Sequence, residues 1–145
     1  SKELFLRFGL DELKKRNPQD LSGGEKQRLA LCVALGKEAD YYFLDEPTKG
    51  MDAKSKKIFG ELLKEWTKME KSIVMVSHDM EFTAKYADEI SLLYQGEIIV
   101  QCPVREFMEE NQFYTTGMNR VTRRVNPHII TIEDVKKYAK RKNSQ

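Results

Sequence analysis

The sequence predicts an α/β fold built on a mostly parallel sheet, with a β-hairpin at one edge and a small C-terminal helical extension. Two short apolar runs, Tyr41–Leu44 and Ser72–Val76, have the length and composition of buried strands. An amphipathic stretch from Ala53 to Met69 lies between them and predicts a long helix. Two further apolar runs meet at Gln95-Gly96, the spacing of a two-residue hairpin turn. Alternation of strand, helix and strand is typical of a parallel sheet.

The other elements expected are mostly short helices. Asn17-Pro18 interrupts the N-terminal pattern, because proline disfavours helix at the residue before it. Thr131 is a candidate cap for the last helix. We expect helices over residues 2–8, 11–15, 22–37, 80–86, 104–110 and 132–142, with an irregular stretch between the last two.

The composition indicates an ordinary soluble domain. The 145 residues are 40% apolar and 33% charged, and no apolar run approaches the roughly 20 residues of a membrane span. We expect no secretory leader, and we expect Cys32 and Cys102 to be buried, reduced thiols, as suits a cytosolic protein. The net charge of +2 does not indicate nucleic-acid binding.

The excess of positive charge is concentrated at the C-terminus. From Arg120 onward the acidic residues are Glu133 and Asp134, against eight lysines and arginines. Such a segment suits contact with anionic lipid or an acidic partner, and it equally suits a solvated helix end.

The segment Leu21–Leu31 (LSGGEKQRLAL) contains a helix start with unusual glycines. Ser22 and Glu25 have the spacing of a capping box, which is common. Gly23 and Gly24 are less expected, since glycine in a first helical turn costs stability. Bare N–H groups at a helix N-terminus are suited to a phosphate. The segment is therefore a candidate phosphate site.

Acidic and imidazole side chains follow the two predicted strands. Asp45 and Glu46 end the first strand, where adjacent carboxylates suit Mg²⁺ binding and activation of a water. His78 follows the second strand and reaches the same sheet edge if the strands are parallel neighbours. Taken singly, each of these is more often a loop or structural residue. Together at one edge they predict a ligand site.

The order and spacing of these motifs resemble the C-terminal half of an ATP-binding-cassette (ABC) ATPase. LSGGEKQR is similar to the ABC signature, FLDEP to the Walker B strand with its glutamate, and KGMD (Lys49–Asp52) to the D-loop. The resemblance covers residues 20–101 and implies a P-loop NTPase fold. Lys49 and Met51 depart from the commoner S-G-L-D wording, which leaves Asp52 in register.

The resemblance also implies roles for individual residues. Glu46 would be the general base, with His78 steadying the γ-phosphate and the water, and Asp45 would serve Mg²⁺. The candidate ATP-contacting residues are Ser22, Gly23, Gly24, Glu25 and Asp52, the first three facing ATP held by an opposite cassette.

The printed sequence contains no G-x-x-x-x-G-K-[ST] phosphate loop. We therefore expect this loop upstream of Ser1, and we expect negligible ATP binding by these 145 residues alone. By resemblance, residues 1–37 would end the helical subdomain, 38–101 would form the catalytic core and 102–145 a C-terminal extension.

The function expected is ATP hydrolysis that powers solute transport, import rather than export, at the cytoplasmic face of a membrane. The partners would be a second cassette and a transmembrane subunit, with no nucleic acid. The wording EPTKGMDAKSK resembles energy-coupling-factor importers of cobalt and vitamins. The alternatives are a soluble ABC ATPase acting on DNA or ribosomes and a non-catalytic half-cassette.

Overall fold

The computed structural model describes residues 2–142 and divides into two compact units between His78 and Asp79. The three-part division expected from the motifs stays a prediction. Within residues 2–142, no helix combines the length and apolar composition of a membrane crossing.

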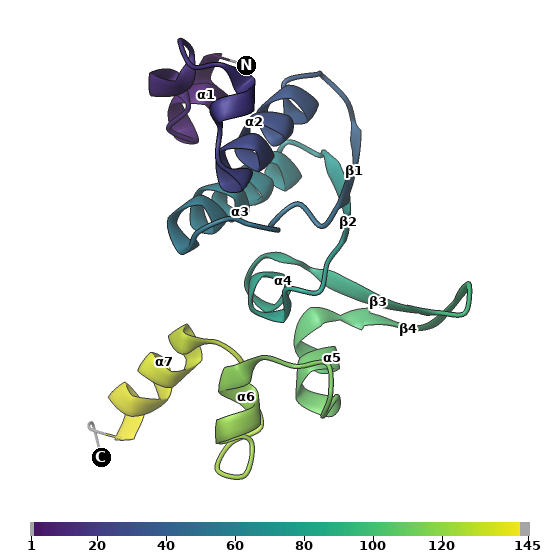
Figure 1. The fold of residues 1–145 in the computed structure, drawn as a ribbon. Coiled ribbons are helices and arrows are strands. Elements are labelled where there is room, and N and C mark those ends of the chain that lie inside the picture. Colours follow the sequence, from purple (N-terminus) through teal and green to yellow (C-terminus); the bar gives the residue numbers. More distant parts are fainter. Residues whose placement is uncertain (1, 143–145) are drawn as a thin grey trace. The chain divides into compact units, whose positions relative to one another are not determined.

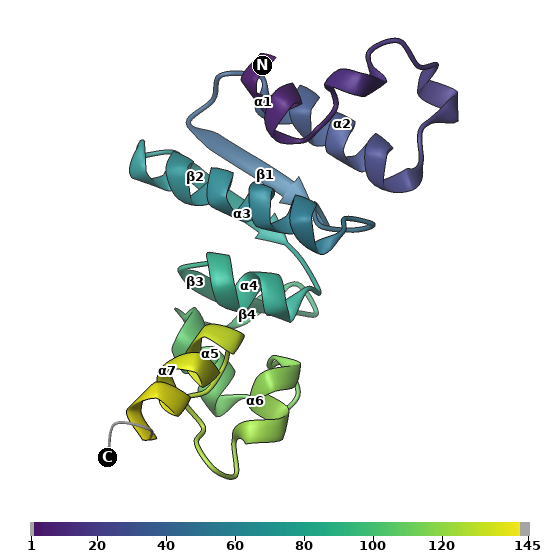
Figure 2. The same cartoon turned by 90° about the vertical axis from the view of Figure 1, so that its left-hand side faces the viewer.

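The first unit is a parallel strand pair covered by helices. The strands β1 (Tyr41–Asp45) and β2 (Ser72–Val76) pair in register from Tyr41 opposite Ser72 to Asp45 opposite Val76. Their helical partners lie on one side of the pair (Figures 1 and 2). The helices are α1 (Lys2–Arg7), α2 (Gly23–Leu35) and α3 (Ala53–Lys68), with 3-10 turns at Asp11–Leu13 and Pro18–Asp20.

The core of this unit lies between the helices and one face of the strands. Its buried side chains include Leu31, Leu35, Phe59, Leu62 and Leu63. Burial of such aliphatic and aromatic side chains contributes roughly 1.5–3 kcal/mol each. Arg7 of α1 forms two hydrogen bonds with Glu65 of α3 and ties these helices together.

The expectation that both strands are buried is wrong for one face of the pair. The side chains of Tyr41, Phe43, Val74 and Val76 are 54–77% exposed, whereas Tyr42 between them is buried. Alternate side chains of a strand point to opposite faces, and the helices of residues 2–78 cover a single face. The predicted stripe on α3 also ends early, since Met69 is exposed.

The second unit is a hairpin with short helices. Its strands β3 (Glu89–Tyr94) and β4 (Glu97–Pro103) pair antiparallel through a turn at Gln95 and Gly96, both with positive φ. They form a sheet of their own, distinct from the β1–β2 pair. The α/β class is as predicted. The helices are α4 (Met80–Tyr86), α5 (Val104–Glu110), α6 (Gly117–Thr122) and α7 (Ile132–Lys142).

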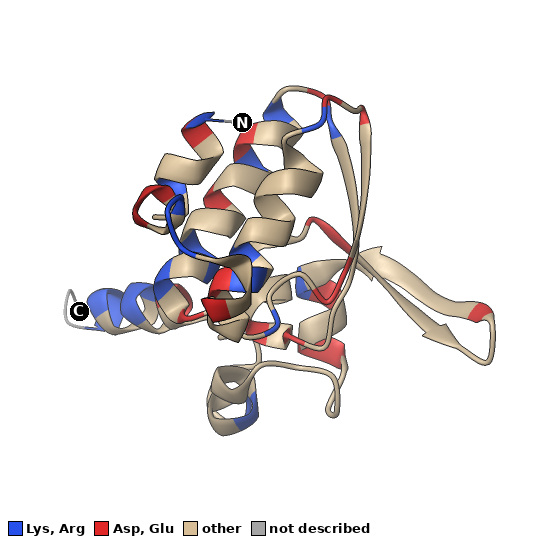
Figure 3. Ribbon diagram, turned by 45° about the horizontal axis from the view of Figure 1, so that its top comes forward, with Lys and Arg blue, Asp and Glu red and all other residues tan. Residues whose placement is uncertain are grey.

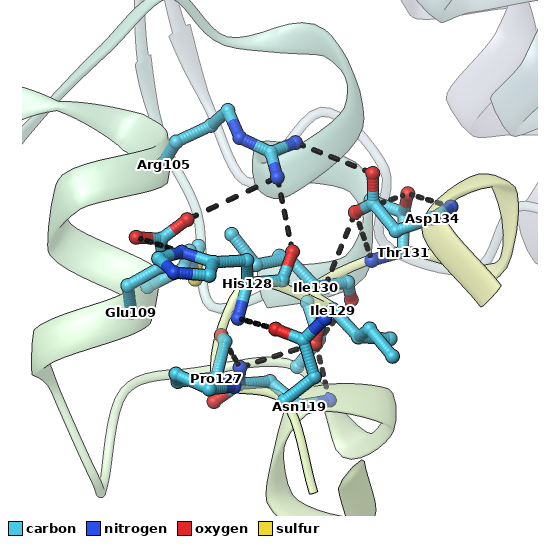
Figure 4. A network of polar contacts seen from close by, with 12 residues as sticks. Arg105, Glu109, Asn119, Pro127, His128, Ile129, Ile130, Thr131 and Asp134 are labelled. Carbon is cyan, nitrogen blue, oxygen red and sulfur yellow. Dashed lines mark hydrogen bonds and ion pairs between the residues drawn. The ribbon is translucent and has the colours of Figure 1, made fainter. Parts of the chain in front are cut away.

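A buried polar network holds the segment after α5, where an irregular stretch was expected. Asn119 of α6 is fully buried, and its side-chain amide donates to the carbonyls of Pro127 and Ile129, at 2.7 and 3.1 Å. Its Oδ1 accepts from the hydroxyl of Thr115 at 3.2 Å. Figure 4 shows Asn119 facing the loop around Pro127 and Ile129 that leads to α7. Helix α6 lies within the stretch expected to be irregular, so the sequence pattern did not predict this helix.

A charged cluster lies beside this network. Arg105 of α5 donates to the carbonyl of His128 at 3.1 Å and lies 3.5 Å from Asp134 (Figure 4). His128 lies 2.9 Å from a carboxylate oxygen of Glu109. The Asp134 N–H donates to the Thr131 hydroxyl at 3.4 Å, so the predicted cap of α7 forms, and the Asp134 carboxylate accepts the Thr131 N–H in return. These contacts connect α5 to the start of α7.

The two cysteines differ in burial. Cys32 is buried, and burial raises the pKa of its thiol to about 11, so it stays protonated at neutral pH. Cys102 is half-buried, which corrects the expectation that both thiols are buried. Cys102 lies in β4 and packs, partly buried, against the apolar cluster that contains Val104 and Phe107.

Candidate functional site

The N-terminus of α2 is capped by its own side chains. The Ser22 backbone N–H donates to Glu25 at 2.7 Å, and the Glu25 N–H donates to the Ser22 hydroxyl at 3.3 Å. This is the predicted capping box. The hydrogen bond from the Ser22 backbone is the main cause of a lowered pKa at Glu25. Glu25 is thus ionised and engaged in the cap.

The two glycines of α2 differ in their surroundings. A Cβ on Gly23 would meet nothing within 4 Å among residues 2–142, so this described part of the chain leaves that side of the first turn open. A Cβ on Gly24 would lie 2.8 Å from the carbonyl oxygen of Gly50, closer than real Cβ atoms come. Gly23 therefore leaves room for a ligand, whereas Gly24 is required by contact with the loop after β1.

The ends of the two strands bring Glu46 and His78 together, as the sequence predicted. The Glu46 N–H donates to the Val76 carbonyl at 2.9 Å, which continues the β1–β2 pairing by one residue. The His78 N–H donates to Glu46 Oε1 at 3.0 Å, and His78 Nε2 lies 3.7 Å from the same oxygen. The imidazole is 94% exposed, so it is free to turn toward a ligand.

Glu46 has an unfavourable backbone conformation. Its φ is +43°, in the left-handed region that a residue with a side chain seldom adopts. Such a conformation costs on the order of 1–3 kcal/mol and is concentrated at functional sites. The hydrogen bonds to Val76 and from His78 hold the residue there.

The D-loop residues continue this turn toward α3. Asp52 caps α3 by accepting the Ser55 N–H at 2.7 Å, and this hydrogen bond is the main cause of the lowered pKa of Asp52. Within this loop Pro47, Thr48 and Met51 are buried, while Lys49 is exposed. In its own chain, Asp52 therefore has a structural role as a helix cap.

Asp45 is the candidate metal ligand, and it is exposed at the end of β1. Among residues 2–142, no three histidine, cysteine or acidic side chains gather as a metal cluster would. Mg²⁺ at nucleotide sites is held by one or two carboxylates, phosphate oxygens and water. A single exposed carboxylate at this sheet edge fits that requirement.

Two residues of α2 that the sequence motifs did not single out connect this helix to the loop after β1 and to α3. Gln27 donates to the Pro47 carbonyl at 3.2 Å, and Arg28 donates to the Ser55 hydroxyl at 3.3 Å. Gly24, Gln27 and Arg28 are spaced at i, i+3 and i+4, so they share one helical face. That spacing in the sequence indicates a shared helical face. The element that this face contacts depends on the fold.

Known proteins resemble this chain in sequence and in fold. The family model described as ABC transporter matches residues 1–49. A putative ABC transporter ATP-binding protein of Bacillus cereus is 46% identical over 135 residues, and the match covers 93% of this chain. The chain belongs to the ABC transporter ATP-binding family. An ATP-binding protein EcfA2 of an energy-coupling factor transporter, from Staphylococcus saprophyticus, is 31% identical over 77% of this chain.

This ABC chain spans only part of those relatives. It covers 24% of the length of the Bacillus cereus protein and 39% of the Staphylococcus saprophyticus protein. A solved dimeric ATP-binding cassette in a post-hydrolysis state, bound to ADP and Pi, superposes with a TM-score of 0.64 at 27% identity. That match covers 72% of this chain and 45% of the solved chain. An ATP-binding subunit of an ABC transporter has a TM-score of 0.67 at 22% identity, a likeness of fold.

Proposed function

We propose that this ABC chain is part of an ATP-hydrolysing subunit that powers solute import through a membrane transporter. The observation that carries the proposal is the contact between Glu46 and His78 at the end of a parallel strand pair. A carboxylate in this place, hydrogen-bonded at one oxygen, can accept a proton from an attacking water. His78, largely exposed beside it, can contact the γ-phosphate and the water.

The N-terminus of α2 would bind the γ-phosphate of ATP held by a second cassette. Ser22, Gly23 and Gly24 bring backbone N–H groups to a helix start, where partial positive charge favours an anion. Glu25 would hold the Ser22 end of this helix in place through the capping box. Asp52 would lie at the boundary with the second cassette, one residue before α3.

Asp45 would hold Mg²⁺ together with the phosphates and water. The ion, when bound, neutralises charge on the transferring phosphoryl group. ATP is the nucleotide named for the relatives that match this chain. We propose a cytoplasmic position on the inner face of the cell membrane, with a second cassette and a transmembrane subunit as partners.

The test uses Gly23→Val in the full-length protein. A side chain at residue 23 has open space, so the variant should fold with an unchanged melting temperature. It would hold the phosphate away from the helix N–H groups, and misplacement by about 1 Å costs about 10²-fold in rate. We expect a loss of ATP hydrolysis of this order, measured by phosphate release.

The control is Gly9→Val, which tests a valine at a glycine outside the site. Gly9 has φ +65°, so this variant should lose stability but keep its rate per folded molecule. Hydrolysis by Gly23→Val within threefold of the parent, at an unchanged melting temperature, would contradict phosphate binding at this helix.

The C-terminal helix α7 offers a test of the proposed assembly. Its lysines and arginines gather toward its C-terminal end (Figure 3), and none of its described side chains is buried. We propose that α7 contributes to contact between cassettes.

Removing residues 135–145 from the full-length protein should therefore weaken nucleotide-free assembly, measured by light scattering. Asp134 is retained because it bonds Thr131 and the Ile130 N–H. Unchanged assembly would mean that α7 serves its own subunit.

A further inference from the structure

One face of α2 supports the loop that carries the candidate base. The face consists of Gly24, Gln27 and Arg28, and the loop runs from Glu46 to Asp52. Each of the three residues contacts a different part of the loop or the helix after it. The contacts are spread from Pro47, next to Glu46, to Ser55, beyond Asp52.

The glycine contact is the closest of the three. Gly24 lies so near the Gly50 carbonyl that a methyl group would sit 2.8 Å from its oxygen, which is backbone and cannot rotate away. Gly50 itself has φ +72°, a conformation that favours glycine. Two glycines are thus needed for one close approach between the helix and the loop.

The hydrogen bonds fix the two sides of this contact. Gln27 donates to the carbonyl of Pro47, a buried residue adjacent to Glu46. Arg28 donates to the hydroxyl of Ser55, whose backbone N–H is bound by Asp52. The loop is also wound on itself, because Lys49 N–H donates to the Glu46 carbonyl at 3.1 Å. Displacing its Pro47 end would therefore move Glu46.

We propose that Gly24, Gln27 and Arg28 are positioning residues that hold Glu46 in its reactive place. This inference rests on the proposed function, because it assigns these residues to the same hydrolysis reaction. It adds to the phosphate-binding role of the N-terminus of α2 a second role for one face of the same helix. The strained φ of Glu46 supplies the physical need, since such a conformation persists only where its surroundings hold it.

The test is Gln27→Met in the full-length protein. Methionine has a similar length and no N–H donor, so the Pro47 carbonyl loses its partner while the packing volume is nearly kept. We expect kcat for ATP hydrolysis to fall about tenfold or more, with KM for ATP within about threefold, the pattern of a lost transition-state interaction. We also expect faster amide hydrogen exchange across residues 46–52.

The matched control is Lys26→Met, the same replacement one residue earlier. Lys26 is exposed and its ammonium group bonds the Gln19 carbonyl, away from the loop. This variant should keep kcat and the exchange rates of residues 46–52. An unchanged kcat in Gln27→Met, or an equal fall in Lys26→Met, would overturn the proposal.

A second pair of variants separates this proposal from the proposed function. Gly24→Ala should lower the melting temperature and speed exchange at residues 46–52, whereas Gly23→Ala should do neither, because its methyl meets open space. If the parent protein hydrolyses no ATP, the proposed function fails and the role in catalysis fails with it. If the parent is active but the two alanine variants are alike in exchange, the support by α2 is wrong while the proposed function stands.

Discussion

Replacing Glu46 by glutamine in the full-length protein is expected to slow ATP hydrolysis by about 10²–10⁴-fold, the usual contribution of a general base. Glutamine keeps the oxygen that accepts the His78 N–H at 3.0 Å, so the loop should keep its shape. It lacks the basic carboxylate, so the attacking water loses its proton acceptor. ATP binding should persist, because Glu46 is proposed to act on the water and not on the nucleotide.

The measurement combines phosphate release with filter-bound ATP in one preparation. Glu38→Gln is the control, since Glu38 is an exposed acid in the loop before β1 and has no proposed role. The control should hydrolyse ATP at the parent rate. If Glu46→Gln retains hydrolysis within threefold of the parent, Glu46 is a loop residue and not the base.

Replacing Asn119 by leucine is expected to destabilise the C-terminal segment by about 3–5 kcal/mol. The carbonyls of Pro127 and Ile129 and the Thr115 hydroxyl would all lose Asn119 as a partner. The Pro127 carbonyl, left without a hydrogen bond, costs about 1–3 kcal/mol, and each of the two other lost bonds costs about 1 kcal/mol. Thr115 retains its bond to the Met108 carbonyl and Ile129 a bond from Thr122, which limits the total.

Native-state hydrogen exchange of amides between residues 119 and 130 would measure this loss directly. Asn111→Ala is the control, because Asn111 accepts the N–H groups of Phe113 and Tyr114 in an exposed turn. That variant should cost about 1 kcal/mol or less. Equal effects of the two substitutions would show that the Asn119 network does not hold the segment.

Much of the fold follows from local pattern. The bounds of β2, α4 and α7 agree with the sequence prediction, because each has a clear apolar period and a cap or turn at its ends. Helix α6 was missed because its few residues carry no apolar stripe. Its stability depends on Asn119 reaching carbonyls eight and ten residues away, and no local pattern encodes that contact.

The candidate site was likewise predictable only in part. The meeting of Glu46 and His78 was predictable, since parallel neighbours end at one sheet edge. The different surroundings of Gly23 and Gly24 were not, because the reason for Gly24 lies in a carbonyl 26 residues further along the chain. Gln27 and Arg28 are ordinary helix formers by sequence, and only the fold brings them to the Pro47 carbonyl and the Ser55 hydroxyl.

The most direct test of the account is calorimetric titration of these 145 residues with Mg-ATP, beside the full-length protein. The N-terminus of α2 and the Glu46–His78 pair are proposed to contact the γ-phosphate alone, whereas most phosphate contacts of P-loop proteins come from a loop that the printed sequence lacks. We predict binding by the full-length protein and no dissociation constant below about 100 μM for the 145 residues. A dissociation constant below about 100 μM for the 145 residues alone, which is a binding free energy stronger than about −5.5 kcal/mol, would contradict this prediction.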